Sequence, residues 1–446
     1  MAIINEITSE GDGLPYYVVD DILGKLPAKS MVRFMCISKF LSTNSITLAT
    51  LQILIRLPAK SLVRFMCLSK SWHNLIRNDP SFKALYNKTS NARQANGYLV
   101  QQIIDNGKEL NDGLRFELEE LGLLEDLRKR KFFQIFSLHH GEDLVEYKSF
   151  GTQRMRGPNI PYQNPGNSYH RREDLGKDFV IASHNGLFLM TDSHGLFLWN
   201  PSINKAKAIP QLEFPSHWRL QTGGCGVGYC KKDEEDFKIV YFRAQVVHTD
   251  DVPQVQEWMV STYSMSADSW KEIQDIYIPG RSPANTKVVT LDGVPHWIAI
   301  SWDDKDIIMS FNFDKEEFGH IMSPVPSDAE DVLGNYKGLL SIFRCSSVEY
   351  TEATGSRAHY EMWVLKDYGG EPIWTKLFFF QHTVSGELKS MGHNGEVFLN
   401  KGHNGKLCTL YDTGEVRKFD IYINNGGYTH DGCIIPYRES LVLLGE

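Results

Sequence analysis

Apolar positions follow two different patterns along the 446-residue chain. Near the N-terminus, Leu62, Phe65, Leu68 and Trp72 recur at steps of three and four, which is the period of an amphipathic helix. Beyond about residue 97, short apolar or β-branched runs are bounded by Gly, Asn and Asp, which is typical of strands. The pattern therefore predicts a small helical module followed by a long body made of strands.

The helical module contains an internal repeat. Residues 26–39 read LPAKSMVRFMCISK, and residues 57–70 read LPAKSLVRFMCLSK. The match fails beyond residue 70, where only the second copy continues to Trp72. Because the repeats of a solenoid would continue, we interpret this as a local duplication.

The second copy has a physical interpretation as a short helix. Pro58 suits a first helical turn, where its missing N–H costs nothing. Lys60 and Arg64 lie one turn apart, on the side away from the apolar stripe. The module has more apolar surface than so small a unit can bury alone. It either packs on the body as a small helical bundle or offers a groove to a partner.

The body shows paired strand-like runs and a recurring glycine. An aromatic residue follows many of the pairs: Trp270, Phe318, Trp374 and Phe419. The runs that we expect to be strands are Gly186–Leu189 with Leu196–Trp199, Phe237–Phe242 with Met259–Ser264, His296–Ile300 with Ile307–Phe313, Gly338–Phe343 with Glu361–Leu365, Val397–Leu399 with Leu407–Tyr411, and Ser440–Leu444. Glycines ahead of one strand in each unit are spaced by 42, 65, 45 and 57 residues. This irregular period predicts a β-propeller, with a pair of β-sandwiches as the second choice.

Several segments depart from the strand pattern. Residues Glu109–Lys131 are rich in charge and leucine, which predicts a helical insertion in the first blade. Residues 149–178, 243–258 and 346–358 are polar and resemble loops. Because loops on a rigid scaffold usually carry recognition, we expect these three to contact a target.

Charge is distributed unevenly between the two parts. Residues 1–96 carry 12 Lys and Arg against 6 Asp and Glu, which is a balance of +6. Since the net charge of the whole chain is −8, the remaining residues have a balance of −14. The net charge argues against nucleic acid as the main partner. The sequence has no run of eighteen apolar residues, so we expect no membrane span, and we see no secretory signal. With only seven cysteines, the sequence favours a soluble protein of a reducing compartment, cytoplasmic and/or nuclear.

Candidate chemistry is sparse. The His-Asn-Gly triplets at 184–186, 393–395 and 403–405 suggest metal ligands, but Asn-Gly is the favoured two-residue hairpin turn. Cys225 and Cys230 lack a second pair at zinc spacing, so we expect free thiols. No phosphate loop, nucleophile elbow or dinucleotide motif is present. We therefore expect no catalytic residue, no metal and no cofactor. A glycosidase would need two carboxylates close together in space, and the sequence alone does not show which Asp or Glu residues meet.

The helical module closely resembles an F-box. Leu14-Pro15 with Val18–Leu23 resembles the opening of that domain, and Leu57–Phe65 with Ser69–Trp72 resembles its middle and end. The resemblance implies docking onto an acidic Skp-type adaptor and recruitment of a cullin. We expect residues 51–77 to supply the contact; the alternative is that residues 14–24 pack on the second copy and residues 27–50 loop out. The residues expected to bind the adaptor are Leu57, Pro58, Leu62, Phe65, Leu68, Lys70 and Trp72.

The body resembles the F-box-associated domain of plant F-box proteins. Asn185-Gly186-Leu187 followed by Leu198–Pro201 is similar to the NGL and LWNP motifs of that family. Gly226–Tyr229 with Asp236–Val240 resembles its GFGYD and DYKVV motifs. The layout is shared with the S-locus F-box-like group of self-incompatibility.

Together these features predict an α+β multidomain protein. Residues 14–96 form the F-box module, and residues 97–446 form a kelch-like, propeller-like recognition domain. The resemblance implies a non-catalytic substrate-recognition subunit of a Skp-cullin-F-box ubiquitin ligase, which binds an adaptor and an unknown protein substrate, but no nucleic acid and no membrane. The alternative is a propeller enzyme or a carbohydrate-binding protein with a structural helical N-terminus.

Overall fold

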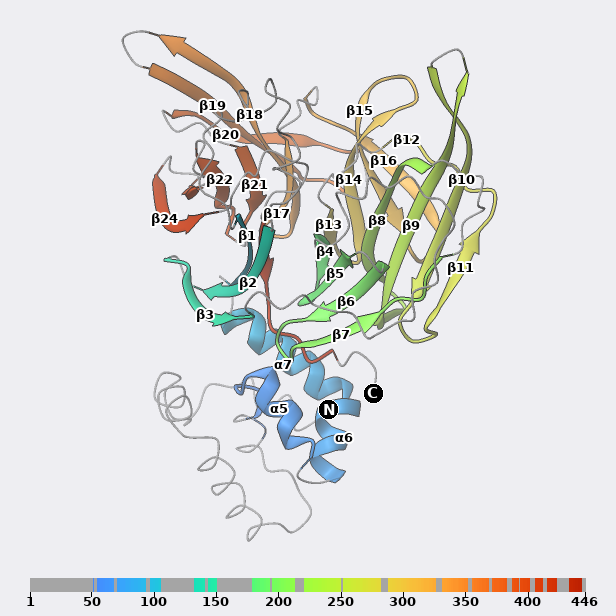
Figure 1. Cartoon of the computed structure of the whole chain (residues 1–446), viewed down its shortest axis with the longest axis vertical. Helices are drawn as coiled ribbons and strands as arrows, with labels where there is room; N and C mark the ends of the chain where they lie inside the picture. The colour runs from blue at the N-terminus through green and yellow to red at the C-terminus, as the bar shows by residue number, and fades with distance from the viewer. Residues whose placement is uncertain are drawn as a thin grey trace. The chain divides into compact units, whose positions relative to one another are not determined.

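A computed structural model shows two compact units (Figure 1). The first contains residues 1–93 together with Glu439–Leu441, and the second contains residues 94–438 and 442–446. The residues that the structure describes are 51, 54–67, 70–93, 97–105, 132–140, 143–150, 179–192, 195–212, 220–249, 252–281, 288–325, 331–351, 355–368, 371–382, 387–392, 394–401, 406–411, 415–422 and 433–442.

The first unit contains three described helices: α5 (Ala59–Phe65), α6 (Lys70–Asn78) and α7 (Pro80–Arg93). The expected apolar stripe is present, but the chain turns at Met66 and Cys67 and divides it between α5 and α6. At the start of α7, Asp79 Oδ1 accepts a hydrogen bond from the amide of Phe82 at 3.0 Å, which caps the helix ahead of Pro80. Among the described residues of this unit, the buried side chains are Leu54, Ile55, Leu57, Ala59, Leu62, Phe65, Ile76, Phe82, Tyr86, Ser440 and Leu441.

The second unit is a six-bladed β-propeller, and its strands belong to six separate sheets. Blade 1 contains β1 (Gly97–Asp105), β2 (Phe132–His140), β3 (Val145–Ser149) and β25 (Cys433–Tyr437). Blade 2 contains β4 (Phe179–His184), β5 (Leu187–Asp192), β6 (Gly195–Asn200) and β7 (Lys205–Ala208). Blade 3 contains β8 (Leu220–Cys230), β9 (Asp233–Thr249), β10 (Val252–Ser264) and β11 (Ser269–Ile273).

The remaining blades follow in chain order, as the colours of Figure 1 show. Blade 4 contains β12 (Gly280–Arg281), β13 (Val289–Leu291), β14 (Val294–Ser301), β15 (Asp306–Asn312) and β16 (Glu317–Met322). Blade 5 contains β17 (Val332–Tyr336), β18 (Leu339–Thr351), β19 (Gly355–Leu365) and β20 (Trp374–His382). Blade 6 contains β21 (Glu387–Met391), β22 (Val397–Lys401), β23 (Lys406–Leu410) and β24 (Val416–Tyr422).

The blades are arranged radially and the ring is closed by the end of the chain. Strands at one edge of each sheet contact the corresponding strand of a neighbouring blade: β4 contacts β8, β17 contacts β21, and β21 contacts β25. Within blade 1, β25 pairs antiparallel with β1, so that Tyr437 is opposite Gly97. The C-terminal strand therefore joins the N-terminal strands of the propeller in one sheet. The propeller prediction is confirmed, and the sandwich alternative is wrong.

Two-residue turns recur after the first strand of several blades. Asn185-Gly186, Asp292-Gly293 and Lys337-Gly338 have positive φ at both positions, as a type I′ hairpin turn requires. The hairpin interpretation of residues 184–186 is confirmed, while residue 393 and residues 402–405 lie outside the described part. Three of the five glycines in the sequence spacing lie in these turns, whereas Gly228 lies within β8.

Tryptophans of one blade donate hydrogen bonds to the backbone of the preceding blade. Trp270 Nε1 on β11 donates to the carbonyl oxygen of Pro210 at 2.6 Å, and Trp374 Nε1 on β20 donates to that of Met322 at 3.0 Å. The expected aromatic residue after each strand pair therefore lies on the last strand of its blade. Where this residue is a tryptophan, its indole N–H joins neighbouring blades.

Three expectations about the body need correction. The described parts of residues 243–258 and 346–358 are paired strands, because β9 pairs with β10 up to Thr249 and Val252, and β18 pairs with β19 up to Thr351 and Gly355, with one bulge each. Both strand pairs rise toward the top of Figure 1. Polar composition concealed their backbone pairing. The expected strand Ser440–Leu444 is absent from its described part, since residues 440–442 have no strand assignment and β25 ends at Tyr437. The expected helix at residues 109–131 and most of residues 149–178 lie outside the described residues.

Replacement of Gly228 by alanine tests the close approach of blades 3 and 4. A Cβ on Gly228 would overlap the carbonyl oxygen of Gly293, which already accepts the amide of Tyr229 at 3.2 Å. We expect Gly228→Ala to lower the free energy of unfolding by about 1–3 kcal/mol, the usual cost of overpacking. Urea titration measures the loss. Gly319→Ala is the control, since its Cβ would meet only Ser310 Oγ at 3.2 Å; equal losses for both variants would contradict this account.

A second variant tests the buried ion pair of blade 5. Arg344 and Asp331 form a bidentate pair at 2.9 and 3.0 Å, with side chains only 5% and 4% exposed. Arg344→Met leaves a buried carboxylate without its cation, so we expect a loss of about 3–5 kcal/mol. Thermal denaturation should show a large drop, and Arg344→Met/Asp331→Leu should recover much of it. Lys315→Met removes a pair exposed by more than half on both sides and should leave the midpoint unchanged.

Candidate functional site

The helical unit presents its predicted site residues in two groups. Leu57, Leu62 and Phe65 are buried, with exposed fractions of 1%, 0% and 4%. Pro58 and Lys70 are exposed and Trp72 is half-buried, while the side chain of Leu68 lies outside the described residues. The buried group therefore positions α5, and the second group reaches the surface. Adaptor contact by these residues stays a prediction.

Trp72 is held by the core of the helical unit. Its ring lies edge-on to that of Phe65, with 5.7 Å between the ring centroids and an interplanar angle of 74°. A half-exposed aromatic ring that is already fixed loses little conformational entropy when it is covered. Such side chains are typical anchors of protein interfaces.

The exposed side of α5 and the start of α6 is basic. Lys60, Arg64 and Lys70 are all exposed, and the two helices contain no acidic residue in their first turns. Positive side chains on one surface favour a partner with a complementary negative charge, mainly through faster and more selective association.

Glu439 was missed by sequence analysis. This residue belongs to the first unit, where its Oε2 atom accepts a hydrogen bond from Tyr86 Oη at 3.2 Å and from the amide of Ala59 at 3.4 Å. The carboxylate thus lies at the N-terminal end of α5, where negative charge is favourable. No sequence signal could have found it, because the partners are more than 350 residues apart.

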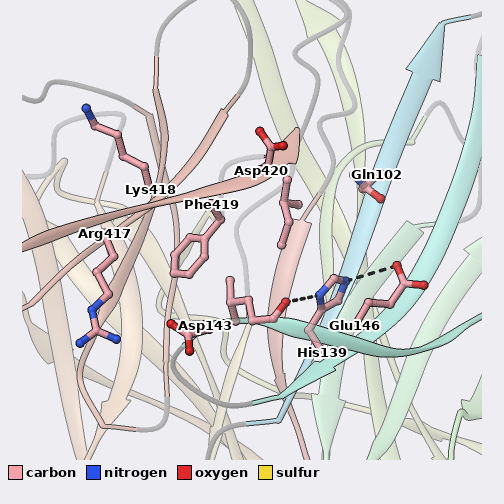
Figure 2. Close-up of a pocket in the computed structure, with 10 residues that line it drawn as sticks. Gln102, His139, Asp143, Glu146, Arg417, Lys418, Phe419 and Asp420 are labelled. Carbon is pink, nitrogen blue, oxygen red and sulfur yellow. Dashed lines mark hydrogen bonds and ion pairs between the residues drawn. The ribbon is translucent and has the colours of Figure 1, made fainter.

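A cavity of about 600 Å³ is lined by β1, the β2–β3 turn and β24 (Figure 2). One wall comes from blade 1 and is built around His139, at the end of β2. The other wall is Arg417–Ile421, from the last strand of blade 6. Ring closure brings these segments together, although they are almost 300 residues apart in the sequence.

His139 fixes the turn on the blade 1 side of the cavity. Because a carbonyl oxygen only accepts, His139 Nδ1–H donates to the carbonyl of Leu144 at 2.8 Å, and Nε2 lies 2.8 Å from Ser137 Oγ. Burial lowers the pKa of His139 below its usual value, so the ring is neutral at pH 7. Leu144 has a positive φ of 48°, a conformation that non-glycine residues rarely adopt, and the His139 bond supports it.

The sides of the cavity differ in polarity. Phe419 and Leu144 are buried and belong to one apolar cluster. Asp143 and Glu146 are exposed at the edge of the blade 1 wall, and Glu146 Oε2 is 4.0 Å from His139 Nε2. The cavity therefore combines an apolar floor with an acidic edge.

His184 and His296, elsewhere in the propeller, are also neutral at pH 7. Burial lowers the pKa of His184 and of His296 to about 4. His184 packs against the ring of Tyr229, and His296 Nε2 is 2.5 Å from Tyr368 Oη. The described residues contain no group of three or more His, Cys, Asp and Glu side chains with metal-binding geometry.

The two thiols that sequence analysis singled out do not form a disulfide. Cys225 and Cys230 are both free, and burial raises the pKa of each thiol. Within the described parts of the chain, no helix is both long and apolar enough to cross a bilayer.

Comparison with known proteins gives matches to both units. Residues 48–84 match the F-box domain, and residues 166–433 match the F-box associated β-propeller domain. The F-box match thus covers the second copy of the repeat.

Three curated relatives match this chain at low identity. A putative F-box protein of Arabidopsis thaliana is 23% identical over 54% of this chain and 62% of the relative. An F-box/kelch-repeat protein of the same plant is 24% identical over 47% of this chain and 55% of the relative. A further putative F-box protein of Arabidopsis thaliana is 26% identical over 65% of this chain and 67% of the relative. The matches therefore span about half to two thirds of the length of these three relatives.

Among solved structures, TolB from Acinetobacter baumannii is 10% identical, with a TM-score of 0.37 over 81% of this chain and 73% of that chain. A likeness of that size supports no conclusion about this protein. The family match rests instead on the propeller domain, which covers more than half of the chain. The chain belongs to the family of proteins with an F-box associated β-propeller domain, and it carries an F-box domain ahead of that propeller.

Proposed function

We propose that this protein is a substrate receptor of a Skp-cullin-F-box ubiquitin ligase. The observation that carries the proposal is the combination, in one chain, of an F-box domain at residues 48–84 with an F-box associated propeller at residues 166–433. The F-box docks onto a Skp-type adaptor, which links it to a cullin. The propeller holds a target protein and is not itself an enzyme.

The surface of the helical unit supports the adaptor part of the proposal. Lys60, Arg64 and Lys70 form its basic side, and Trp72 offers an anchored aromatic ring beside them. An acidic adaptor would be attracted by the lysines and the arginine and would cover the indole. We assign the contact to the second copy of the repeat, because the F-box match covers that copy.

The receptor acts by placing its target close to the ligase. Two binding sites on one chain raise the effective concentration of the target near the ubiquitin-carrying subunit, without any chemistry on the chain itself. Because this role needs access to the ubiquitin machinery, we place the protein in the cytoplasm, the nucleus or both. The target is a protein whose identity the proposal leaves to experiment.

Trp72→Ala tests the proposed adaptor contact in the full chain. We expect the dissociation constant for a purified Skp-type adaptor to rise about 30-fold, since an interface anchor contributes about 2 kcal/mol or more. Surface plasmon resonance measures the change. Lys70→Glu should weaken binding several-fold and reduce its dependence on salt.

Phe40→Ala, at the corresponding end of the first copy, is the matched control and should leave adaptor binding unchanged. If only Phe40→Ala lost the adaptor, the assignment to the second copy would be wrong. If the unmodified chain did not bind the adaptor at all, the receptor proposal would fail. Circular dichroism of each variant separates a lost contact from a lost fold.

A further inference from the structure

The cavity between blades 1 and 6 has the size of a binding site. Its volume of about 600 Å³ lies within the range of roughly 300–1,000 Å³ that is usual for ligand sites in proteins. Asp143 and Glu146 are both exposed at its edge, so the cavity is accessible to a side chain that enters from solvent.

The carboxylates of Asp143 and Glu146 on the blade 1 wall have few positive side chains near them. Asp143 forms no ion pair with the described residues, and Glu146 Oε2 lies 4.0 Å from Nε2 of His139, which forms an ion pair only when the ring is protonated. The His139 ring is buried, and because burial lowers its pKa below the usual value, it adds no positive charge at pH 7. The wall therefore carries two carboxylates beside a neutral ring.

The cations of the opposite wall do not neutralise these carboxylates. Arg417 Nε donates to Glu415 Oε1 at 3.3 Å, and its guanidinium carbon lies 5.4 Å from the centre of the Tyr411 ring. In Figure 2, the side chains of Arg417 and Lys418 extend away from His139 and Glu146. Among the described residues, neither Arg417 nor Lys418 thus forms an ion pair with Asp143 or Glu146.

The floor of the cavity suits the stem of a long basic side chain. Phe419 and Leu144 are 8% and 5% exposed and pack in the same cluster. Lysine and arginine bury their methylene groups against such surfaces while the charged end stays near water or a carboxylate. A small inorganic cation would make no use of this floor.

An extended segment can also bind along β24. This strand is the last of its sheet and pairs only with β23 among the described strands. The outer N–H and C=O groups of such an edge strand can pair with a peptide strand, and neighbouring pockets then select its side chains. The cavity lies directly beside this edge, because residues 417–421 of β24 form one of its walls.

We propose that this cavity binds a lysine or arginine side chain of a basic, extended segment in the target protein. The proposal rests on the proposed receptor function and names the class of target. The balance of −14 over residues 97–446 favours association with a basic partner over an acidic one.

The experiment uses the full chain and a short fluorescein-labelled peptide of alternating valine and lysine. Fluorescence anisotropy measures binding, and the same peptide with glutamate in place of lysine is the probe control. We expect the lysine peptide to bind, the glutamate peptide not to bind, and binding to weaken as salt is raised. For Asp143→Asn/Glu146→Gln we expect the dissociation constant to rise about five-fold or more, from two partly exposed ion pairs.

The matched control is Asp275→Asn/Glu371→Gln, which removes the same charge from two exposed carboxylates outside blades 1 and 6. It should bind the lysine peptide as the unmodified chain does. Equal weakening by both double variants would show that only net charge matters and would overturn the site. Full competition by free spermidine at the concentration of the peptide would also overturn it, because a segment bound along β24 has contacts that a polyamine lacks.

Adaptor binding of the same variants separates this proposal from the receptor function. We expect both double variants to bind the Skp-type adaptor normally. Adaptor binding without peptide binding would reject the cavity and leave the receptor function standing. Peptide binding without adaptor binding would reject the receptor function and leave a basic-peptide site on the propeller.

Discussion

The pairing of β25 with β1 is the constraint on which the propeller depends. It joins Cys433–Tyr437 to Gly97–Gln101 in antiparallel register, and so places the two ends of the propeller sequence in one blade. The approach is close, because a Cβ on Gly97 would lie 2.7 Å from the Tyr437 carbonyl oxygen. The buried Tyr437 hydroxyl lies 2.7 Å from Ser202 Oγ of blade 2, which ties the closing strand to the next blade as well.

Closure has a consequence for binding. It brings the last blade against the first, and the gap that remains between β24 and the β2–β3 turn is the cavity. Residues of that cavity are separated by most of the propeller sequence, so neither wall forms a site by itself. The His139 bond to Leu144 holds one wall in place, while packing of Phe419 into the shared cluster holds the other. Radial arrangement also limits the exposed sheet edges to the last strand of each blade.

Much of the fold could be predicted because its signals are local. The turn at Asn185-Gly186 follows from residues that accept positive φ, and the helical stripe through Leu62 and Phe65 follows from a period of 3.6 residues. The polar segment at residues 243–258 predicts a loop, because it lacks the apolar alternation of a half-buried strand, yet β9 and β10 pair along its described part.

The site was less predictable, because it depends on contacts across long sequence separations. Glu439 reaches Tyr86 and Ala59 from the other end of the chain. The cavity joins His139 to Phe419 only after the ring closes. The helical period predicted the helices that carry the expected adaptor residues. It did not show which of these residues are buried, such as Leu62, and which are exposed, such as Lys70.

The central claim is that two units with opposite charge bind two different partners. Cross-linking mass spectrometry of the full chain bound to its adaptor tests this most directly, with a reagent that joins lysines. The account predicts adaptor cross-links to Lys60 and Lys70, which are exposed on α5 and α6, and none to exposed propeller lysines such as Lys315 and Lys418. Adaptor cross-links concentrated on the propeller lysines would contradict it.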